Sequence, residues 1–178
     1  MTVRTNWATT LLLPLVAIAV ACGEPTAPGS RTPASVFATT NPGRSVNLVT
    51  CPSKVFALSF ALLGPHGGEL TAGPATLIVP AGALASPRVF AISVPRSRYM
   101  DVQIAAIGEE HFVFDQPVTI ALDYSSCDVD ELGEQALTAW FLDTESLQPV
   151  APMLTEDDRV ARRAVFVTDH LSRYALAQ

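Results

Sequence analysis

The chain has 178 residues, of which 49% are hydrophobic and 16% are charged. This length suits one domain, or one domain with a tail, and the composition excludes a disordered acidic chain. The formal net charge of -6 at pH 7 argues against nucleic-acid binding, which needs a basic surface. Fourteen Pro and ten Gly, together with many Val, Ile, Thr and Phe residues, predict β-strands separated by turns.

Residues 1–21 have the plan of a secretory signal peptide. Arg4 makes the start of the chain positive, and an apolar run then covers residues 8–21. A permanent membrane span is a poorer interpretation, because such a helix needs about 20 apolar residues and Pro14 interrupts this run.

The motif Ala19-Val20-Ala21-Cys22 resembles the bacterial lipobox, in which the cysteine is lipidated and becomes the mature N-terminus. The resemblance implies that Cys22 anchors the protein to a membrane through several acyl chains, since a single chain holds a protein only marginally. An ordinary signal peptide cleaved near Ala21 is the alternative. Gly23 stands where an Asp would signal retention in the inner membrane, so we expect the outer membrane or cell surface.

Residues 22–45 are expected to form a disordered tether. Positions 23–45 hold four Pro, three Gly, four Thr and three Ser and show no hydrophobic period. Such a segment cannot bury enough apolar surface to become ordered. As a flexible coil it would span about 25–30 Å, enough to lift a domain off a lipid surface.

From Val46 onward, short β-rich segments recur between turn signals. Segments 56–62 and 118–124 alternate large apolar residues with smaller or polar ones, which is typical of half-buried strands. The other predicted strands are 46–51, 75–79, 88–94, 101–107, 111–115, 137–143, 147–151, 160–168 and 173–177. Turn signals such as Pro117 separate them, and residues 154–158 are expected to form a hairpin tip. The fold predicted for residues 46–178 is all-β, an antiparallel β-sandwich preceded by a signal peptide and a disordered tether.

Four passages together resemble the ZU-five domain, a β-sandwich shared by zonula occludens proteins, netrin receptors and ankyrins. They are residues 67–70 (GGEL), 75–84 (ATLIVPAGAL), 114–120 (FDQPVTI) and 168–175 (TDHLSRYA). The resemblance covers residues 66–178. It implies a non-enzymatic interaction or display module rather than an enzyme that acts on a diffusible substrate.

The tripeptide His170-Leu171-Ser172 resembles the self-cleavage site of some ZU-five relatives and of adhesion-receptor autoproteolysis domains. There the histidine is the base and the serine oxygen attacks the preceding carbonyl. Cleavage between Leu171 and Ser172 is therefore an alternative function. The structural interpretation is that His170 caps or packs a turn while Tyr174 and Leu176 close the core.

Cys51 and Cys127 are the two cysteines left once Cys22 carries lipid. In an exported domain they are candidates for one disulfide, with two separate thiols as the alternative. The sequence cannot decide between these, because pairing requires Cα atoms within about 7 Å of each other.

An acidic cluster surrounds the one segment with any helical character, residues 128–136, which we expect to be a loop with at most a short turn. Its members are Asp123, Asp128, Asp130, Glu131 and Glu134. Oxygen ligands of this kind suit calcium, but the pattern of a calcium loop is missing. The three histidines, His66, His111 and His170, lack zinc-like spacing. We therefore expect no metal site and no cofactor, with a calcium- or carbohydrate-binding sandwich as a further alternative.

These observations predict a lipid-anchored exported bacterial protein whose β-sandwich binds or scaffolds other proteins. Its expected partners are the membrane, through Cys22, and an unidentified protein of the cell envelope, with no nucleic acid.

Overall fold

The computed structural model describes residues 46–53, 55–129 and 133–178. The predicted signal peptide, Cys22 and the tether lie outside these described residues. Within them the chain forms eleven β-strands and no helix. The strands are β1 (Ala57–Leu63), β2 (Gly68–Ala72), β3 (Ala75–Val79), β4 (Arg88–Val94), β5 (Asp101–Ala106), β6 (Val113–Asp123), β7 (Thr138–Leu142), β8 (Pro149–Pro152), β9 (Thr155–Asp158), β10 (Arg163–His170) and β11 (Arg173–Ala177).

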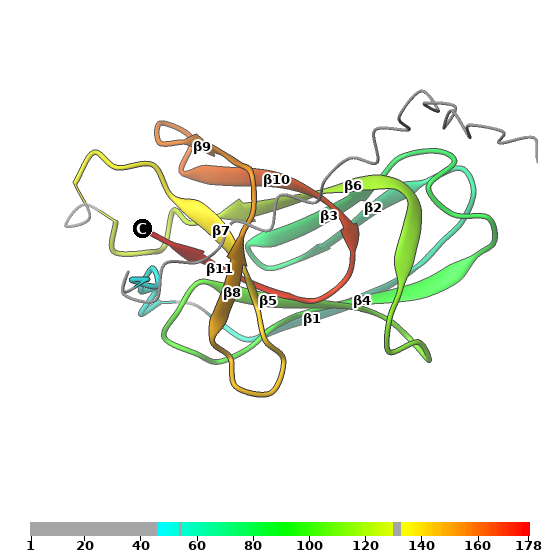
Figure 1. Cartoon of the computed structure of the whole chain (residues 1–178), viewed down its shortest axis with the longest axis horizontal. Helices are drawn as coiled ribbons and strands as arrows, with labels where there is room; N and C mark the ends of the chain where they lie inside the picture. Colours follow the sequence, from blue (N-terminus) through cyan, green and yellow to red (C-terminus); the bar gives the residue numbers. More distant parts are fainter. Residues whose placement is uncertain (1–45, 54, 130–132) are drawn as a thin grey trace, which may run out of the picture. The chain divides into compact units, whose positions relative to one another are not determined.

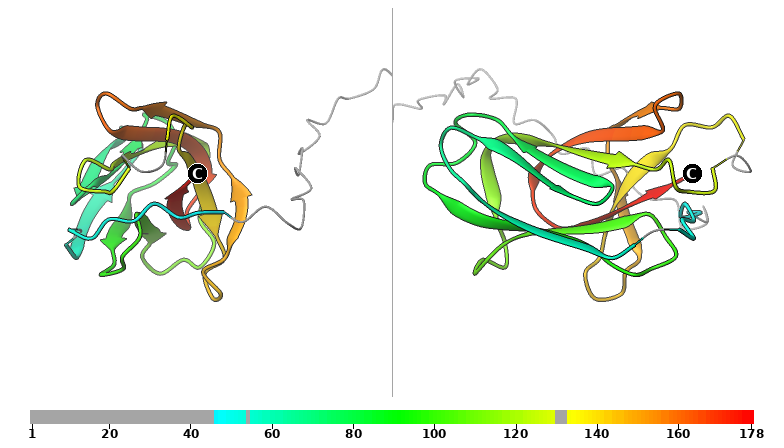
Figure 2. Two further views of the ribbon diagram at one scale, coloured as in Figure 1. Left: turned by 90° about the vertical axis from the view of Figure 1, so that its left-hand side faces the viewer. Right: turned by 180° about the vertical axis from the view of Figure 1, so that it is seen from behind.

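The strands form two sheets in which all the pairs are antiparallel. The six-stranded sheet has the order β1-β4-β5-β11-β7-β8, and the five-stranded sheet has the order β2-β3-β6-β10-β9. Figure 1 shows the strands in place, and Figure 2 shows the same two layers from the end and from behind. The predicted antiparallel β-sandwich is confirmed.

Aromatic side chains from both sheets meet in the core. Phe90 on β4 stacks on Phe114 on β6 at 5.6 Å between ring centroids, and both rings also contact Phe112. Tyr174 on β11 lies 5.0 Å from Phe166 on β10. These pairs join the sheets because large rings bury much apolar area and prefer stacked or edge-on geometry at such distances.

Three predicted strands, 75–79, 88–94 and 173–177, have the bounds of β3, β4 and β11. Strand β2 is not among the predicted strands, since it begins at Gly68 and buries only Leu70 and Ala72. So short an alternation, opened by two glycines, carries little strand signal.

The hairpin tip predicted at residues 154–158 is wrong. Residues Thr155–Asp158 are strand β9, paired with β10 from Phe166↔Thr155 to Arg163↔Asp158. The turn comes afterwards, and Arg162 in it has a positive φ of 51°. Acidic residues are rare in strands, but here Asp157 is held by hydrogen bonds from outside the strand.

Pro117 lies within a strand rather than between two. Most residues of the predicted strands 111–115 and 118–124 belong to one long strand, β6, which runs from Val113 to Asp123 and whose bend is visible in Figure 1. The pairing of β6 with β10 shifts register between Thr168 and His170, opposite this part of β6. Proline lacks a donor for the ladder, and such an irregularity is where a sheet tolerates it.

Residues 46–51 form isolated bridges rather than the predicted strand. Leu48 bridges to Ala177 and Thr50 to Tyr99. Residues 128–129 and 133–136 hold no helix, in line with the expected acidic loop, while residues 130–132 lie outside the described part.

Candidate functional site

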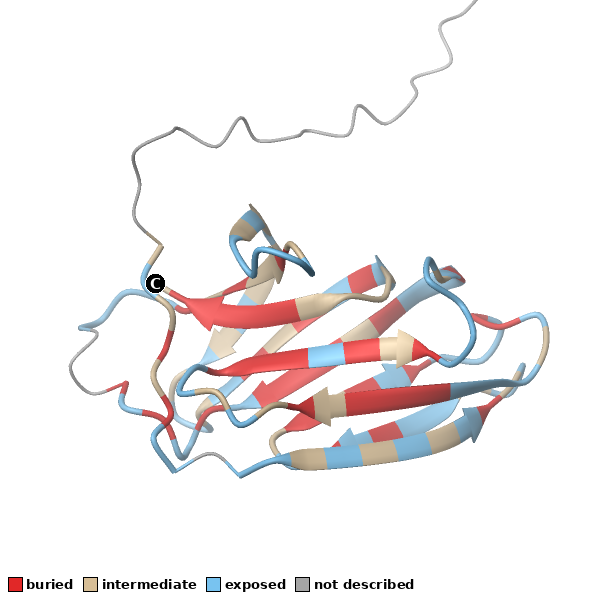
Figure 3. Ribbon diagram, turned by 90° about the horizontal axis from the view of Figure 1, so that it is seen from below, coloured by how far each residue is buried: buried red, intermediate tan, exposed pale blue. Residues whose placement is uncertain are grey.

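Four large apolar side chains face outward along β1 and at the residue just before it, and we call them the β1 apolar face. Its members are Phe56, Leu58, Phe60 and Leu62, exposed to 46%, 50%, 57% and 69% respectively. Figure 3 shows β1 at the lower edge of the sheet, with exposed and intermediate residues in alternation. The predicted period of two is present, but the large residues of this strand face solvent instead of the core.

The side chains on the inward face of β1 are small, because the edges of the two sheets come close together there. Ala57 and Ala61 pack against the core, and Leu63 is the first fully buried residue of the strand. A Cβ atom on Gly73 would lie 3.0 Å from the Cβ of Ala57, and one on Gly68 would lie 2.9 Å from Leu63 Cδ2. Larger side chains would not fit between these strands, so the bulky residues can only point outward.

The β1 apolar face continues onto the neighbouring strand. Leu62 pairs with Val89 on β4, which is 40% exposed, whereas Ala91, the partner of Phe60, is buried. Soluble monomers rarely expose a contiguous apolar patch larger than a few hundred Å², and larger patches mark interaction surfaces. The sequence signal for this surface was the alternation itself, which reports the period but not which side is buried.

The structure places His170 at the end of β10 and Ser172 between β10 and β11. His170 Nδ1 lies 2.9 Å from Asp169 Oδ1 and 3.3 Å from Thr168 Oγ1. This hydrogen bond from His170 holds the pKa of Asp169 below its usual range. Among the polar contacts of the described residues, none joins His170 to Ser172. Self-cleavage remains an untested prediction.

The backbone around His170 has a structural role. Its carbonyl accepts a hydrogen bond of 2.7 Å from the Tyr174 hydroxyl, and Leu171 N donates to Phe112 O at 3.3 Å. Tyr174 and Leu176 are fully buried. The packing of the turn between β10 and β11 therefore matches the structural interpretation of the tripeptide.

His111 and His170 line one surface groove of about 380 Å³, although they are far apart in the sequence. Glu109, Glu110 and Asp143 lie along the same groove. Within the described ranges, no group of three or more His, Cys, Asp or Glu side chains is arranged to hold a metal ion. His66, the third histidine, does not line this groove.

A disulfide joins Cys51 to Cys127 across 76 positions of the sequence. Both cysteines are buried. Next to the disulfide, Asp128 N donates to Thr50 O at 2.8 Å. The covalent bond therefore fastens the segment before β1, which belongs to none of the eleven strands, to the loop after β6.

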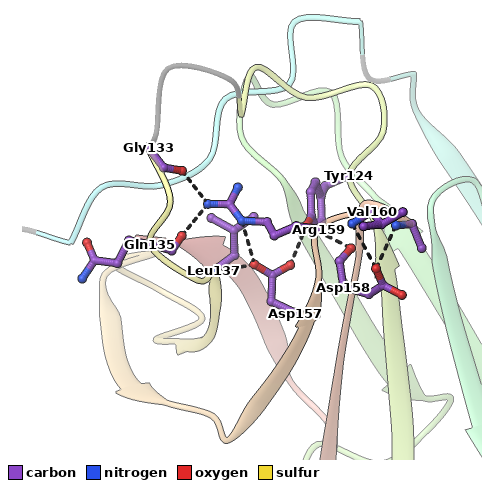
Figure 4. Close-up of polar contacts among 9 residues, drawn as sticks. Tyr124, Gly133, Gln135, Leu137, Asp157, Asp158, Arg159 and Val160 are labelled. Atoms are coloured by element: carbon purple, nitrogen blue, oxygen red, sulfur yellow. Dashed lines mark hydrogen bonds and ion pairs between the residues drawn. The ribbon is translucent and has the colours of Figure 1, made fainter.

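Asp157 on β9 organises the acidic loop, as Figure 4 shows. Its carboxylate accepts hydrogen bonds from Tyr124 Oη at 2.5 Å and from Leu137 N at 2.8 Å, and it lies 3.2 Å from Arg159 Nε. Arg159 Nη2 also donates to the carbonyl of Gly133 at 2.8 Å and to that of Gln135. The loop acids do not converge on a common centre in its described part.

Burial is the main reason why the pKa of Tyr124 lies above its usual value, and the hydrogen bond to Asp157 adds to it. Tyr124 therefore stays a neutral donor to this carboxylate. Sequence reasoning missed the role of Asp157, because its partners Tyr124 and Leu137 are 33 and 20 positions away.

A second polar centre, also missed, lies beside the segment that leads into β1. Asp101 is buried and accepts hydrogen bonds from Arg173 Nε at 3.1 Å and Arg173 Nη2 at 2.5 Å. The pair lines a pocket of about 670 Å³ together with Arg98 and Tyr99. Ser97 donates a further hydrogen bond to Asp101. The charges of this pair are therefore matched within the protein.

No protein-family model and no curated protein matches this chain. In the part of the chain that the structure describes, no helix is long and apolar enough to span a membrane.

Proposed function

We propose that this protein is a lipid-anchored, exported bacterial interaction module that presents the β1 apolar face to a protein partner in the cell envelope. The observation that carries the proposal is the exposure of Leu58, Phe60 and Leu62 on one edge strand and of Phe56 just before it. Water contact with such a row is unfavourable by about 25 cal/mol for each Å² of apolar area, so covering it drives association.

Two further features support a binding role. Edge strands and exposed sheet faces are recurrent recognition surfaces, because backbone pairing supplies affinity and alternate side chains supply specificity. The resemblance of residues 66–178 to ZU-five domains also favours an interaction module. The lipobox-like motif at Cys22 and the Pro- and Thr-rich residues 23–45 favour a domain held at a distance from a membrane.

The binding role is tested by placing a photo-crosslinking amino acid at Phe60 of the full chain in cells. Irradiation is expected to give a protein adduct that is absent when the same amino acid replaces Val160. Val160 is 98% exposed but lies in the turn after β9, away from β1. Equal adducts at the two positions, or none at Phe60, would contradict the proposal.

The anchor is tested separately by mass spectrometry of the N-terminal peptide of the mature protein. We expect the peptide to begin at Cys22 and to carry the mass of acyl chains. A mature chain that begins elsewhere without lipid would remove the anchor from the proposal and leave the binding surface untouched.

A further inference from the structure

The four edges of the two sheets differ in how they are protected against pairing with another chain. Edge strands commonly carry charges or prolines, which prevent a further strand from adding to the sheet. Strand β8 begins and ends with proline, β9 holds three acids, and β2 holds Glu69. Strand β1 (ALSFALL) has neither a charge nor a proline. Its pairing with β4 also runs without a register shift, so no bulge turns this edge away.

The sequence of β1 is nearly symmetrical about Phe60. Phe60 is flanked on each side by a small residue, Ser59 or Ala61. The next residue on each side is a leucine, Leu58 or Leu62. An antiparallel pair of two such strands, related by a two-fold axis at Phe60, would place Phe60 beside its own copy. Each Leu58 would then lie beside Leu62 of the other copy. A two-fold interface needs this kind of self-complementary surface, and a strand with charges of one sign could not supply it.

We propose that the partner of β1 is a second copy of this chain, which pairs antiparallel with β1 and joins the two six-stranded sheets. This inference rests on the proposed function, because it takes the β1 apolar face as the binding surface. The acidic chain would repel itself elsewhere, but the strand that meets its copy is uncharged. The backbone groups on the outer edge of β1 would gain about six to eight hydrogen bonds.

The interface that this geometry gives is small. Pairing along the edge extends the sheet, so Phe60 and the leucines of the two copies touch side by side while most of the β1 apolar face, exposed to 46–69%, stays in contact with solvent. We therefore expect a weak dimer in solution, which anchoring of both copies to one membrane would favour by raising their local concentration.

The expected register, with Phe60 beside its own copy, predicts which single cysteine variants will crosslink. Phe60→Cys in the full chain, oxidised in cells, is expected to form a disulfide-linked dimer of twice the chain mass. Leu58→Cys and Leu62→Cys as single variants should each form at least fivefold less dimer, because neither residue faces its own copy. The double variant Leu58→Cys/Leu62→Cys should restore the yield. Val160→Cys and the unsubstituted chain control for random collision and for any free thiol at Cys22.

A second variant tests the same interface by placing a charge in it. Leu62→Lys, added to Phe60→Cys, places a charge beside the two-fold axis and should reduce the dimer at least tenfold. Val160→Lys should leave it unchanged. Crosslinking at Phe60 no stronger than at Val160, or a failure of Leu62→Lys to reduce it, would overturn the second copy as partner.

The two proposals can fail separately. If the photo-crosslinker at Phe60 captures a different protein and Phe60→Cys gives no dimer, the second copy is overturned and the binding role stands. If neither reagent gives an adduct at Phe60, both proposals are overturned.

Discussion

At the scale of single residues, Asp157 shows how an acidic side chain becomes structural. Its side chain is 1% exposed, and it receives hydrogen bonds from a phenol and a backbone amide while it pairs with Arg159. A carboxylate with several donors can be buried without a net loss, whereas an unpaired one cannot. Asp157 therefore ties the loop before β7 to the β9–β10 hairpin.

We predict that Asp157→Ala lowers the free energy of unfolding by about 2–4 kcal/mol, because the Leu137 amide and the Tyr124 hydroxyl lose the carboxylate that accepts their hydrogen bonds. Glu156→Ala is the matched control on the same strand, where the side chain is exposed, and should change stability by less than about 0.5 kcal/mol. Urea unfolding measures both variants. Equal losses would show that the network around Asp157 adds no stability.

Tyr174 links the core to alkaline stability, since burial raises its pKa to about 12 from 10.0. The unfolded chain therefore loses this proton more readily than the folded chain. The contribution is fully present below about pH 10 and is lost as the pH rises toward 12.

We predict that the free energy of unfolding falls between pH 9 and pH 11.5, and that Tyr174→Phe makes this fall shallower. The fall should not vanish, because Tyr124 also has a raised pKa. Tyr174→Phe also removes the hydrogen bond to the His170 carbonyl and should cost about 1 kcal/mol at pH 8. Denaturant unfolding across this pH range is the measurement, and an unchanged slope would contradict the assignment.

At the scale of elements, β1 shows that an alternating sequence pattern gives the period of a strand but does not show which side of the strand is buried. Its large and small residues alternate as a half-buried strand requires, yet the close approach of β2 reserves the inside for the small ones.

We predict that Ala57→Leu destabilises the protein by about 1–3 kcal/mol through overpacking against Gly73 on the turn after β2. Leu58→Ser, on the adjacent outward position, should cost less than about 1 kcal/mol. Thermal unfolding at low protein concentration compares the two without interference from association. A larger loss for Leu58→Ser would mean that the large residues of β1 are buried after all.

At the scale of the whole molecule, the disulfide closes a loop that contains six of the eleven strands. Cys51 precedes β1 and Cys127 follows β6, so reduction would free the segment before β1 from the loop beyond β6. A cross-link stabilises chiefly by restricting the unfolded chain, and the effect grows with the length of the closed loop.

We predict that replacing Cys51 and Cys127 together by Ala lowers the free energy of unfolding by about 4–5 kcal/mol in the loop-entropy model. Reduction of the unaltered protein should lower its unfolding midpoint to near that of the variant. Thiol labelling of the denatured protein before and after reduction should reveal two added thiols. An unfolding midpoint that does not change on reduction would rule out a contribution of the disulfide to stability.

The sequence by itself determined the all-β class and most strand positions. Strands such as β3, β4 and β11 are marked by local patterns of β-branched residues and by nearby turn residues, and such patterns act over a few positions. Local sequence patterns predicted the ends of strands wrongly where pairing with neighbouring strands sets those ends. The pairing with β10 made residues 155–158 a strand, and the register shift beside Pro117 let β6 continue through it.

Only the tertiary structure decided which face of β1 is buried, which cysteines meet, and which groups hold Asp157. Each depends on residues that lie far apart in the chain: Gly73 beside Ala57, Cys127 beside Cys51, and Tyr124 beside Asp157. A pattern along one strand has the same period whichever side faces the core, so its orientation is fixed by what packs against it. The candidate binding surface became visible only once the space between β1 and β2 was known.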